Sequence, residues 1–246
     1  TCNRAAWLDR CLSSLDRQTY SNFEVVVVDG PSTDNTTDVL ARYGNRVRAG
    51  STPHRVLSVS RNEGIALAQG EIIAFLDDDA VPADDWLEKL VGAFARPKVG
   101  GVGGCTLRMN AREIEFRNGV LDEEGFVRWN EPEPGVEYDW SRGWLNTVEG
   151  CNCAFRREAL ERIGGFDERI EYYHDEADVV MRLAAHGYLI EHRPDAVVYH
   201  EAAPSAVRDK RRKLNWYPIA KNTVYVAVLN YAGPLPRSRM VLRVAR

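Results

Sequence analysis

The chain has 246 residues, 44% of them hydrophobic, with a formal net charge of -4 and a sequence pI near 5.8. That composition can bury one substantial core, and α/β chains of this length commonly form one domain. The mildly acidic balance argues against a general nucleic-acid binder, and no run of about 18 apolar residues predicts a membrane span. Five sparse cysteines, an odd number, favour a reducing cytoplasm over a disulfide framework.

The chain begins at Thr1 and ends in the basic stretch RSRMVLRVAR, with neither an initiating Met nor a signal-like segment. We therefore expect both ends to continue into a longer protein.

The first half of the chain alternates helix and strand signals. Apolar residues repeat at helical spacing over 7–15, and VVVV at 25–28 predicts a strand buried on both faces. The turn residues at 29–35 contain several N-cap candidates, so a helix is expected to follow and to run through Tyr43. This part of the chain therefore predicts helix, strand and helix in that order.

A second unit of the same kind follows. Residues 60–69 predict a helix that Gly70 ends, EIIAFL at 71–76 predicts a central strand, and a further helix is expected at about 84–94. Such alternation with short connections implies right-handed βαβ crossovers and a mostly parallel sheet, so the fold class is α/β.

Ligands of such sheets bind beyond the carboxyl ends of the strands. Asp29 and Asp77 each come directly after a buried-strand pattern. We therefore expect both side chains at the ligand-binding edge.

Three consecutive carboxylates, Asp77, Asp78 and Asp79, end the second strand pattern. Carboxylates a few ångströms apart repel by roughly 1 to 4 kcal/mol per pair, so a tight cluster favours protonation or a bound cation. A Mn²⁺ or Mg²⁺ ion suits a short acidic turn, because it takes one or two protein carboxylates and fills its other sites with water and phosphate. The alternative is a solvated turn at a helix N-terminus, where the helix dipole favours acids.

A second acidic group stands at the start of a predicted helix near Asp175. Its first turn carries Asp175, Glu176 and Asp178, and the dipole again offers a purely structural explanation for each acid. His200 ends another strand pattern, PDAVVYHE, and is either structural or a contact to a metal or a diphosphate.

The remaining segments carry weaker signals. Residues 117–144 predict a loop-rich excursion, and 148–155 predict a strand whose two cysteines are buried apolar groups. In the tail, the basic run and aromatic residues of 208–217 suit an anionic membrane surface or a lipid-linked phosphate, although a charged helix covering the sheet explains them equally well.

Two enzyme families offer an explanation of the acidic turn. Asp77-x-Asp79-x-Val81 matches the haloacid-dehalogenase phosphatase signature, which normally lies on the first strand, whereas here a complete strand–helix unit precedes it. The chain also resembles family 2 glycosyltransferases over about residues 1–200. That resemblance rests on five segments in the expected order: TCNR, CLSSLDRQTYSNFEVVVVDGPSTDNT, SRNEGIALAQGEIIAFLDDD, EGCNCAFRREALERIGGFDE and HDEADVVMRLAAHGY.

The resemblance implies a GT-A fold with a nucleotide-sugar-binding half at 1–104, an acceptor half at 105–205 and a basic, aromatic extension at 206–246. It also implies transfer of a sugar from a nucleotide diphosphate to a glycan or lipid-linked hydroxyl acceptor, with inversion and a divalent metal, Mn²⁺ or Mg²⁺. We expect no nucleic-acid partner and a cytoplasmic location, with peripheral membrane contact through 208–217. A non-catalytic nucleotide or sugar binder of the same fold is the other alternative, and two intact acidic groups disfavour it.

The resemblance assigns roles residue by residue. Family members use the position of Asp79 for the metal and that of His200, in some cases, for the same ion. Glu176 falls on the usual catalytic base, with Asp175 as the second choice, because the family motif Glu-Asp-x-Asp occurs here with Asp and Glu exchanged. The positions expected to line the sugar donor are Thr1, Arg4, Asp29, Arg61, Asn62, Asp77 and Asp78.

Overall fold

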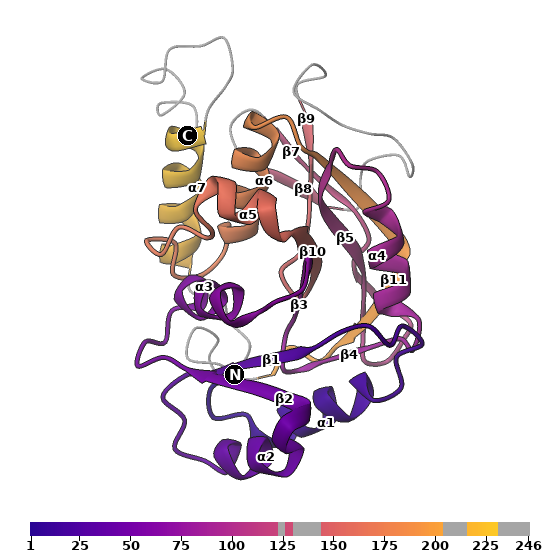
Figure 1. Cartoon of the computed structure of the whole chain (residues 1–246). Helices are drawn as coiled ribbons and strands as arrows, with labels where there is room; N and C mark the ends of the chain where they lie inside the picture. Colours follow the sequence, from indigo (N-terminus) through magenta and orange to yellow (C-terminus); the bar gives the residue numbers. More distant parts are fainter. Residues whose placement is uncertain (123–125, 130–143, 204–215, 231–246) are drawn as a thin grey trace.

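The computed structural model describes residues 1–122, 126–129, 144–203 and 216–230 (Figure 1). Its helices are α1 (Ala5–Leu15), α2 (Thr36–Tyr43), α3 (Leu57–Leu67), α4 (Trp86–Ala93), α5 (Arg157–Ile163), α6 (Asp175–Ala185) and α7 (Trp216–Asn230). Its strands are β1 (Val25–Asp29), β2 (Val47–Ser51), β3 (Ile72–Leu76), β4 (Ala80–Pro82), β5 (Val99–Arg108), β6 (Ile114–Phe116), β7 (Gly119–Asp122), β8 (Val127–Trp129), β9 (Trp144–Thr147), β10 (Asn152–Arg156) and β11 (Leu189–His200).

The central sheet has the strand order β3-β10-β5-β11-β4, and β6 pairs with β5. Strands β3, β5 and β11 run in one direction, whereas β10, β4 and β6 run in the other. Strands β1 and β2 form a separate parallel pair, and β8-β7-β9 form an antiparallel sheet of three strands. The α/β class is thus confirmed, with antiparallel strands placed among the strands of the βαβ units.

Helices cover both faces of the central sheet (Figure 1). Helix α4 packs against β5 and β11, while α5 and α6 pack against β10 and the β9–β11 region. Each face has its own apolar core, because Trp86 and Leu90 of α4 belong to one buried cluster and Val179 and Leu183 of α6 to another. A third cluster joins α1 and α2 to the β1–β2 pair.

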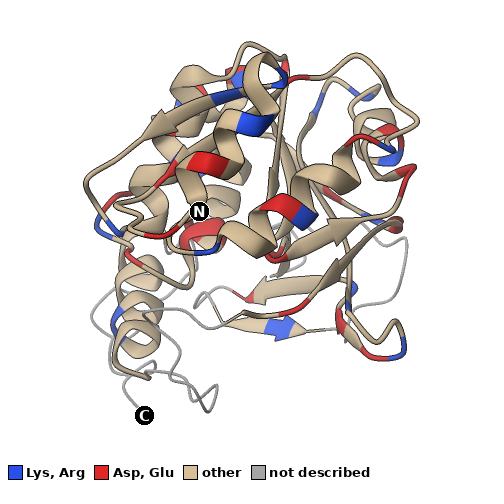
Figure 2. Ribbon diagram, turned by 90° about the horizontal axis from the view of Figure 1, so that it is seen from below, with Lys and Arg blue, Asp and Glu red and all other residues tan. Residues whose placement is uncertain are grey.

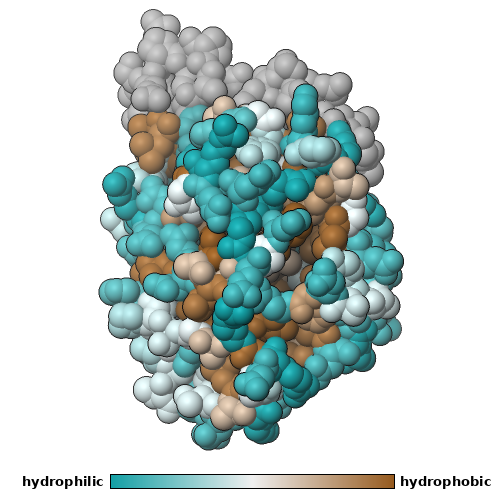
Figure 3. Space-filling model, viewed as in Figure 1, coloured by the Kyte–Doolittle hydropathy of each residue, from teal (hydrophilic) through white to brown (hydrophobic). Residues whose placement is uncertain are grey.

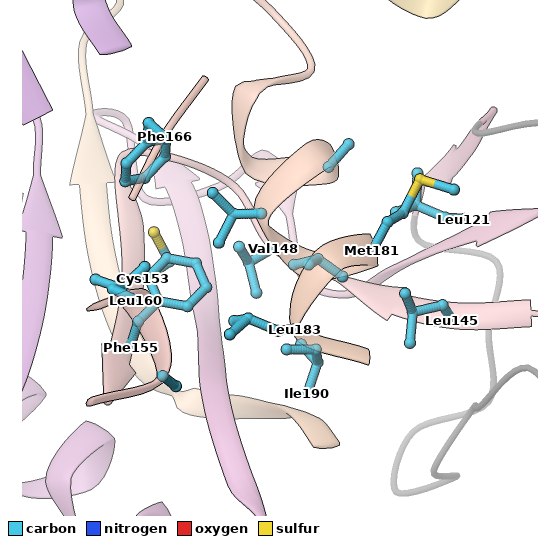
Figure 4. Packing of buried hydrophobic residues seen from close by; sticks show 14 of the residues in the cluster. Leu121, Leu145, Val148, Cys153, Phe155, Leu160, Phe166, Met181, Leu183 and Ile190 are labelled. Atoms are coloured by element: carbon cyan, nitrogen blue, oxygen red, sulfur yellow. The ribbon is translucent and has the colours of Figure 1, made fainter. Parts of the chain in front are cut away.

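The largest core lies between β10 and α6, and Figure 4 shows its side chains converging from these elements. Phe155 of β10 and Phe166 are in edge-to-face contact, with ring centroids 6.5 Å apart. Cys153 of β10 is fully buried in the same core, and burial raises the pKa of its thiol well above the usual range. The interpretation of Cys151 and Cys153 as buried apolar residues is therefore confirmed.

A buried amide joins three strands and a helix behind this core. Asn152 has no exposed surface; its Oδ1 accepts a hydrogen bond of 2.8 Å from the indole N–H of Trp86. Its Nδ2 donates to the backbone oxygens of Cys105 and Ala196, at 2.9 and 3.1 Å. Gly104 faces this amide, and a Cβ atom there would collide with it, so the strand needs glycine at that point.

Helix α7 packs against α6 and holds the turn that leads into it. Tyr173 and His174 both have left-handed backbone angles, with φ of 65° and 68°, which non-glycine residues seldom adopt. The Asn222 amide donates to the backbone oxygen of Tyr173 at 3.2 Å, and the Thr223 hydroxyl lies 2.7 Å from Nε2 of His174. Buried polar groups of α7 therefore stabilise a strained turn directly before α6.

Several sequence predictions need correction. Helix α3 begins at Leu57, three residues before the predicted start, and β10 begins at Asn152 rather than at 148. The predicted loop at 117–144 contains β7, β8 and β9 in its described parts. Most of the basic tail, 208–215, lies outside the described residues.

The visible surface is mixed in charge and in polarity. Figure 2 shows acidic and basic residues interspersed over the helices, and Figure 3 shows apolar side chains between polar groups in the middle of another face. Within the described parts of the chain, no helix is long and apolar enough to cross a lipid bilayer.

Replacing the buried amide tests how much it stabilises the sheet. We expect Asn152→Ala to lower the free energy of unfolding by about 2 to 4 kcal/mol, because it removes three buried hydrogen bonds, those of the Trp86 N–H and of the backbone oxygens of Cys105 and Ala196. Urea denaturation measures the loss. Trp86→Phe is the matched control and should lose less, since it removes only one of the three bonds; equal losses would contradict a hub role for Asn152.

Candidate active site

The metal-type cluster forms where three strands meet. Asp77 follows β3 directly, and β4 pairs with the end of β11 so that His200 lies opposite Ala80, beside Asp79. One ligand atom from each of Asp77, Asp79 and His200 lies within 4.8 Å of the other two. The backbone register thus brings together residues that are more than a hundred positions apart in the chain.

The side chains of this cluster are buried and strongly coupled. Although burial alone would lower the pKa of His200, hydrogen bonds to Asp79 and Glu115 raise it to about 10. Burial works against ionisation of Asp79, yet His200 and Arg4 lower its pKa to about 2. Burial and the neighbouring Asp79 raise the pKa of Asp77. In the protein alone, the proton on His200 and the guanidinium of Arg4 therefore supply the positive charge that the acidic turn needs.

The donor set of this cluster fits a divalent cation. Oδ1 of Asp79 is buried, and its one polar partner among the described residues is Nε2 of His200, at 3.2 Å. These two atoms, which could both bind a metal ion, therefore face each other. Nδ1 of His200 lies 3.0 Å from the Glu115 carboxylate, which holds the ring with Nε2 toward Asp79. Two carboxylates and an imidazole suit Mn²⁺, and Mg²⁺ is accommodated if water and phosphate complete its shell.

Arg4 and Asp78 complete the acidic turn. NH1 of Arg4 lies 2.7 Å from Oδ1 of Asp78 and 3.3 Å from Oδ2 of Asp79. The backbone N–H of Ala203 donates to the same Oδ2 of Asp79 at 2.7 Å. Arg4 thus stands at the start of α1 against the carboxylates.

The other residues predicted to line a sugar donor lie in two places. Asp29 ends β1 and accepts a 2.6 Å hydrogen bond from Ser32, while the backbone oxygen of Thr1 accepts one from Gly30, so Thr1 and Asp29 lie at the same strand end. Asn62 lies on α3, where its amide bonds to the backbone of Phe166 in both directions. Donor binding by Asn62 would require those bonds to open.

The second acidic group is built around a buried arginine. Arg61 of α3 forms ion pairs with both Asp175 and Glu176 at the start of α6; NH1 lies 2.7 Å from Oε1 of Glu176. The side chain of Asp175 is 2% exposed and that of Glu176 is 16% exposed, so Glu176 is the one that can reach a ligand. The sequence predicts Arg61 as a residue that lines the sugar donor, and it gives no sign of this pairing with the acidic group of α6.

Electrostatics separates the two carboxyl groups. Burial raises the pKa of Asp175 well above its usual range, and Arg61 offsets this only in part. Burial also opposes ionisation of Glu176, but Arg61 and a hydrogen bond from Asp175 lower its pKa. Of the two, Asp175 therefore holds a proton more readily and Glu176 ionises more readily.

The sequence analysis did not predict a further carboxylate of this region, Glu149, as a site residue. It lies between β9 and β10, within the motif EGCNCAF, and Oε2 is buried without a hydrogen-bond partner. Burial raises its pKa to about 7; the charge of Glu115 adds to the shift and a hydrogen bond from Thr106 opposes it. The available signal was a single acid inside an otherwise apolar strand pattern.

Comparison with known proteins decides the family. The model of "Glycosyl transferase family 2" matches residues 1–164. This chain belongs to glycosyl transferase family 2. The family match leaves the phosphatase interpretation without support, and the acidic turn follows the third strand of the chain rather than the first.

Curated relatives of this family 2 chain act in different settings. It is 34% identical over 216 residues to validoxylamine A glucosyltransferase of Streptomyces hygroscopicus subsp. jinggangensis, an alignment that covers 76% of this chain and 50% of the relative. It is 31% identical to O-antigen biosynthesis protein RfbC of Myxococcus xanthus, covering 82% of this chain and 17% of that protein. The chain therefore spans half or less of the length of these relatives.

Solved structures confirm the GT-A fold. Mannosyltransferase PcManGT of Pyrobaculum calidifontis, determined with GDP-Man and Mn²⁺, aligns with 100% of this chain and 77% of its own at a TM-score of 0.63 and 23% identity. S. aureus TarS 1-349 in complex with UDP-GlcNAc aligns with 98% of this chain and 67% of its own at a TM-score of 0.67 and 18% identity. At these identities the likeness concerns the fold.

The buried Glu149 makes the stability of the metal-free protein depend on pH. Because its pKa is raised in the folded state, the folded protein holds this proton more tightly than the unfolded chain does. Stability should therefore fall as the pH rises from about 5 to 8, by about 1 to 3 kcal/mol from this one group. We expect Glu149→Gln to remove that loss, measured by urea denaturation at both pH values.

The exposed Glu63 of α3 provides the matched control. Glu63→Gln should keep the pH dependence of the wild-type protein. The same slope in Glu149→Gln and in wild type would show that Glu149 is ionised in the folded state as readily as in the unfolded chain.

Proposed function

We propose that this chain transfers a sugar from a nucleotide-diphosphate sugar to a hydroxyl of a glycan or lipid-linked acceptor, with inversion at the anomeric carbon. The observation that carries the proposal is the pair of acidic groups at one edge of the GT-A sheet. One group, Asp77, Asp79 and His200, has the composition of a cation site, and the other presents an ionised Glu176 beside a protonated Asp175.

In this proposal Asp77, Asp79 and His200 hold Mn²⁺ or Mg²⁺. The ion would neutralise charge on the leaving diphosphate. Its binding requires His200 to give up the proton that the carboxylates stabilise, and Glu115 keeps the ring oriented when that happens, because Nδ1 remains free to donate to it. The Mn²⁺ reported with PcManGT supports the choice of metal.

Glu176 acts as the general base. Its carboxylate accepts the proton of the acceptor hydroxyl as that oxygen bonds to the anomeric carbon, and the bond to the diphosphate oxygen breaks with its electron pair leaving on the diphosphate. Arg61 keeps Glu176 ionised at neutral pH, which also makes it a weak base. Proton transfer is therefore expected late, when the attacking oxygen has become acidic.

The sugar donor would occupy the first half of the chain. In this proposal Asp29 and Thr1, which lie at the end of β1, bind the nucleotide base, and Arg4 and Asp78 bind the ribose or the diphosphate; the contact of Arg4 with Asp78 supports the second assignment. The proposed boundary of the donor and acceptor halves, at 104/105, falls inside β5, so both halves share one sheet.

The acceptor is proposed to approach from the side of α6 and α7. Trp216 and Tyr217, at the start of α7, are 69% and 75% exposed. These two aromatic side chains support peripheral contact of residues 208–217 with the cytoplasmic face of a membrane, where amphipathic rings partition well.

The metal site is tested by Asp79→Asn, which keeps an oxygen for the Ala203 N–H but removes the charge. We expect the affinity for Mn²⁺ to fall by at least about 10-fold, so that a given Mn²⁺ concentration adds less to the thermal stabilisation by UDP or GDP, while the protein stays folded. Thermal-shift titration with Mn²⁺ at fixed nucleotide measures this.

Asp84→Asn is the control, because Asp84 lies on the same segment but is 59% exposed and outside the cluster. His200→Ala should weaken the response as well. Wild-type Mn²⁺ dependence in Asp79→Asn would remove Asp79 from the metal site.

The base is tested by Glu176→Gln, whose amide has nearly the shape of the carboxylate. Nucleotide-sugar binding should change little, since the nucleotide sits elsewhere, but transfer should fall by roughly 10²- to 10⁴-fold. Turnover assays with the nucleotide-sugar that stabilises the wild-type protein measure the loss.

Asp175→Asn serves as the comparison and should lose less, because Asp175 already carries a proton. A collapse in Asp175→Asn with near-normal turnover in Glu176→Gln would move the base to Asp175. NMR of the product should give the anomeric configuration opposite to that of the sugar donor, and retention would overturn the single displacement.

A further inference from the structure

Three carboxylate oxygens among the described residues are buried with few or no partners: Oδ2 of Asp78 has no hydrogen-bond partner, Oδ1 of Asp79 has only Nε2 of His200 at 3.2 Å, and Oε2 of Glu149 has none. The first two belong to the acidic turn. Glu149 comes from a different segment of the chain, and neither the metal site nor the base requires it. Thr106 donates a hydrogen bond to this carboxyl group, but leaving Oε2 buried without one costs stability, and a ligand group that reached Oε2 would remove that cost.

The sheet places Glu149 beside the acidic turn. Asn152 of β10 pairs with Leu76 of β3, and β10 runs antiparallel to β3. The loop that enters β10 therefore lies at the strand end from which Asp77 emerges. In agreement, the charges of Asp77 and His200 both act on the ionisation of Glu149.

The same loop touches the proposed base. Gly150 lies flat against Glu176 and Arg61; a Cβ atom on Gly150 would overlap both the Glu176 carboxylate and the Arg61 guanidinium. Glu149 thus stands between the two acidic groups, next to Asp77 through β3 and next to Glu176 through Gly150.

The backbone around Glu149 is held firmly. Val148 is 4% exposed and packs in the main core (Figure 4), where it contacts Gly103 closely. On the other side, the backbone N–H of Asn152 donates to the backbone oxygen of Glu149 at 3.0 Å. The backbone that carries the Glu149 side chain is therefore held in place by packing and hydrogen bonding.

The burial that raises the pKa of Glu149 destabilises the fold, and groups retained at such a cost concentrate at functional sites. A carboxyl group with one free oxygen suits a sugar hydroxyl, which can both donate and accept a hydrogen bond.

We propose that Glu149 binds a hydroxyl group of the sugar carried by the nucleotide donor and so distinguishes a nucleotide-sugar from the free nucleoside diphosphate. The inference rests on the proposed function, because a diphosphate at Asp79 and an acceptor at Glu176 leave the transferred sugar in the space between them. Glu149 is the described carboxyl group with an unpaired oxygen that borders both.

The test compares two affinities in wild type and in Glu149→Ala. Isothermal titration calorimetry in the presence of Mn²⁺ measures the affinity for UDP-glucose, UDP-GlcNAc and GDP-mannose. Each affinity is compared with that for the matching nucleoside diphosphate, UDP or GDP. We expect the wild-type protein to bind one nucleotide-sugar more tightly than the matching diphosphate, and Glu149→Ala to lose about 10- to 100-fold of that margin. Affinity for the diphosphate alone should stay within about 2-fold, and Glu63→Ala should change neither.

Analogues of the preferred donor with one sugar hydroxyl replaced by hydrogen sharpen the test. Removing the contacted hydroxyl should weaken binding to wild type but not to Glu149→Ala, and removing the others should weaken both equally. If Glu149→Ala does not fold, the isosteric Glu149→Gln replaces it in the same binding measurements, and the expected loss of affinity for the nucleotide-sugar is smaller.

Three results would overturn the inference. Equal weakening of diphosphate and nucleotide-sugar would place Glu149 at the metal, and an unchanged margin with a raised acceptor KM would place it at the acceptor. A wild-type protein that binds no nucleotide-sugar would remove the proposed function together with the inference. If Glu176→Gln remained active, Glu176 would not be the base, but the binding comparison with the hydroxyl analogues would be unaffected. Failure of the proposed base can therefore be distinguished from failure of the proposed Glu149 contact.

Discussion

The buried guanidinium of Arg61 is the interaction on which the site depends. It joins α3 to the start of α6 across 115 positions of the chain, and its positive charge lies against the two carboxyl groups that are buried together there. The rings of Phe75 and Phe166 lie over it, with centroids 5.6 and 5.1 Å from its central carbon, so its position is fixed by packing as well as charge. An ionised Glu176 is tolerated in this buried environment because the guanidinium beside it is itself held in place.

The acidic turn follows the same rule with different partners. Arg4 and a protonated His200 supply the positive charge around Asp78 and Asp79, each from a distant part of the chain. Unlike the guanidinium of Arg61, the imidazole of His200 can lose its proton. In the proposed metal site a bound cation would then supply the positive charge that this proton supplies in the protein alone. One acidic site is therefore permanently compensated, whereas the other is compensated in a way that a ligand can replace.

The sequence predicted the parts of the fold that depend on local pattern. Periodicity located α1, β1, α2, β3, α4 and α6, but it missed β5, because four glycines in Val99–Arg108 hide the strand signal. Only the close packing of these glycines against Tyr188, Phe155, Val148 and Asn152 explains them. Acidic motifs and family resemblance brought out Asp77, Asp79, Glu176 and His200. The pairing of Arg61 with Asp175 and the isolation of Glu149 are tertiary properties, and no spacing along the chain encodes them.

The bonds from α7 to the turn before α6 have a consequence for local unfolding. Asn222 and Thr223 hold Tyr173 and His174 in left-handed conformations, and the Asn230 amide donates to Oδ1 of Asp178 at 2.8 Å. If α7 detaches, the turn loses the contacts that offset its strain, and the first turn of α6 relaxes with it. The amide protons of both segments should therefore exchange with solvent as one cooperative unit, although α7 lies entirely beyond the residues that define the family.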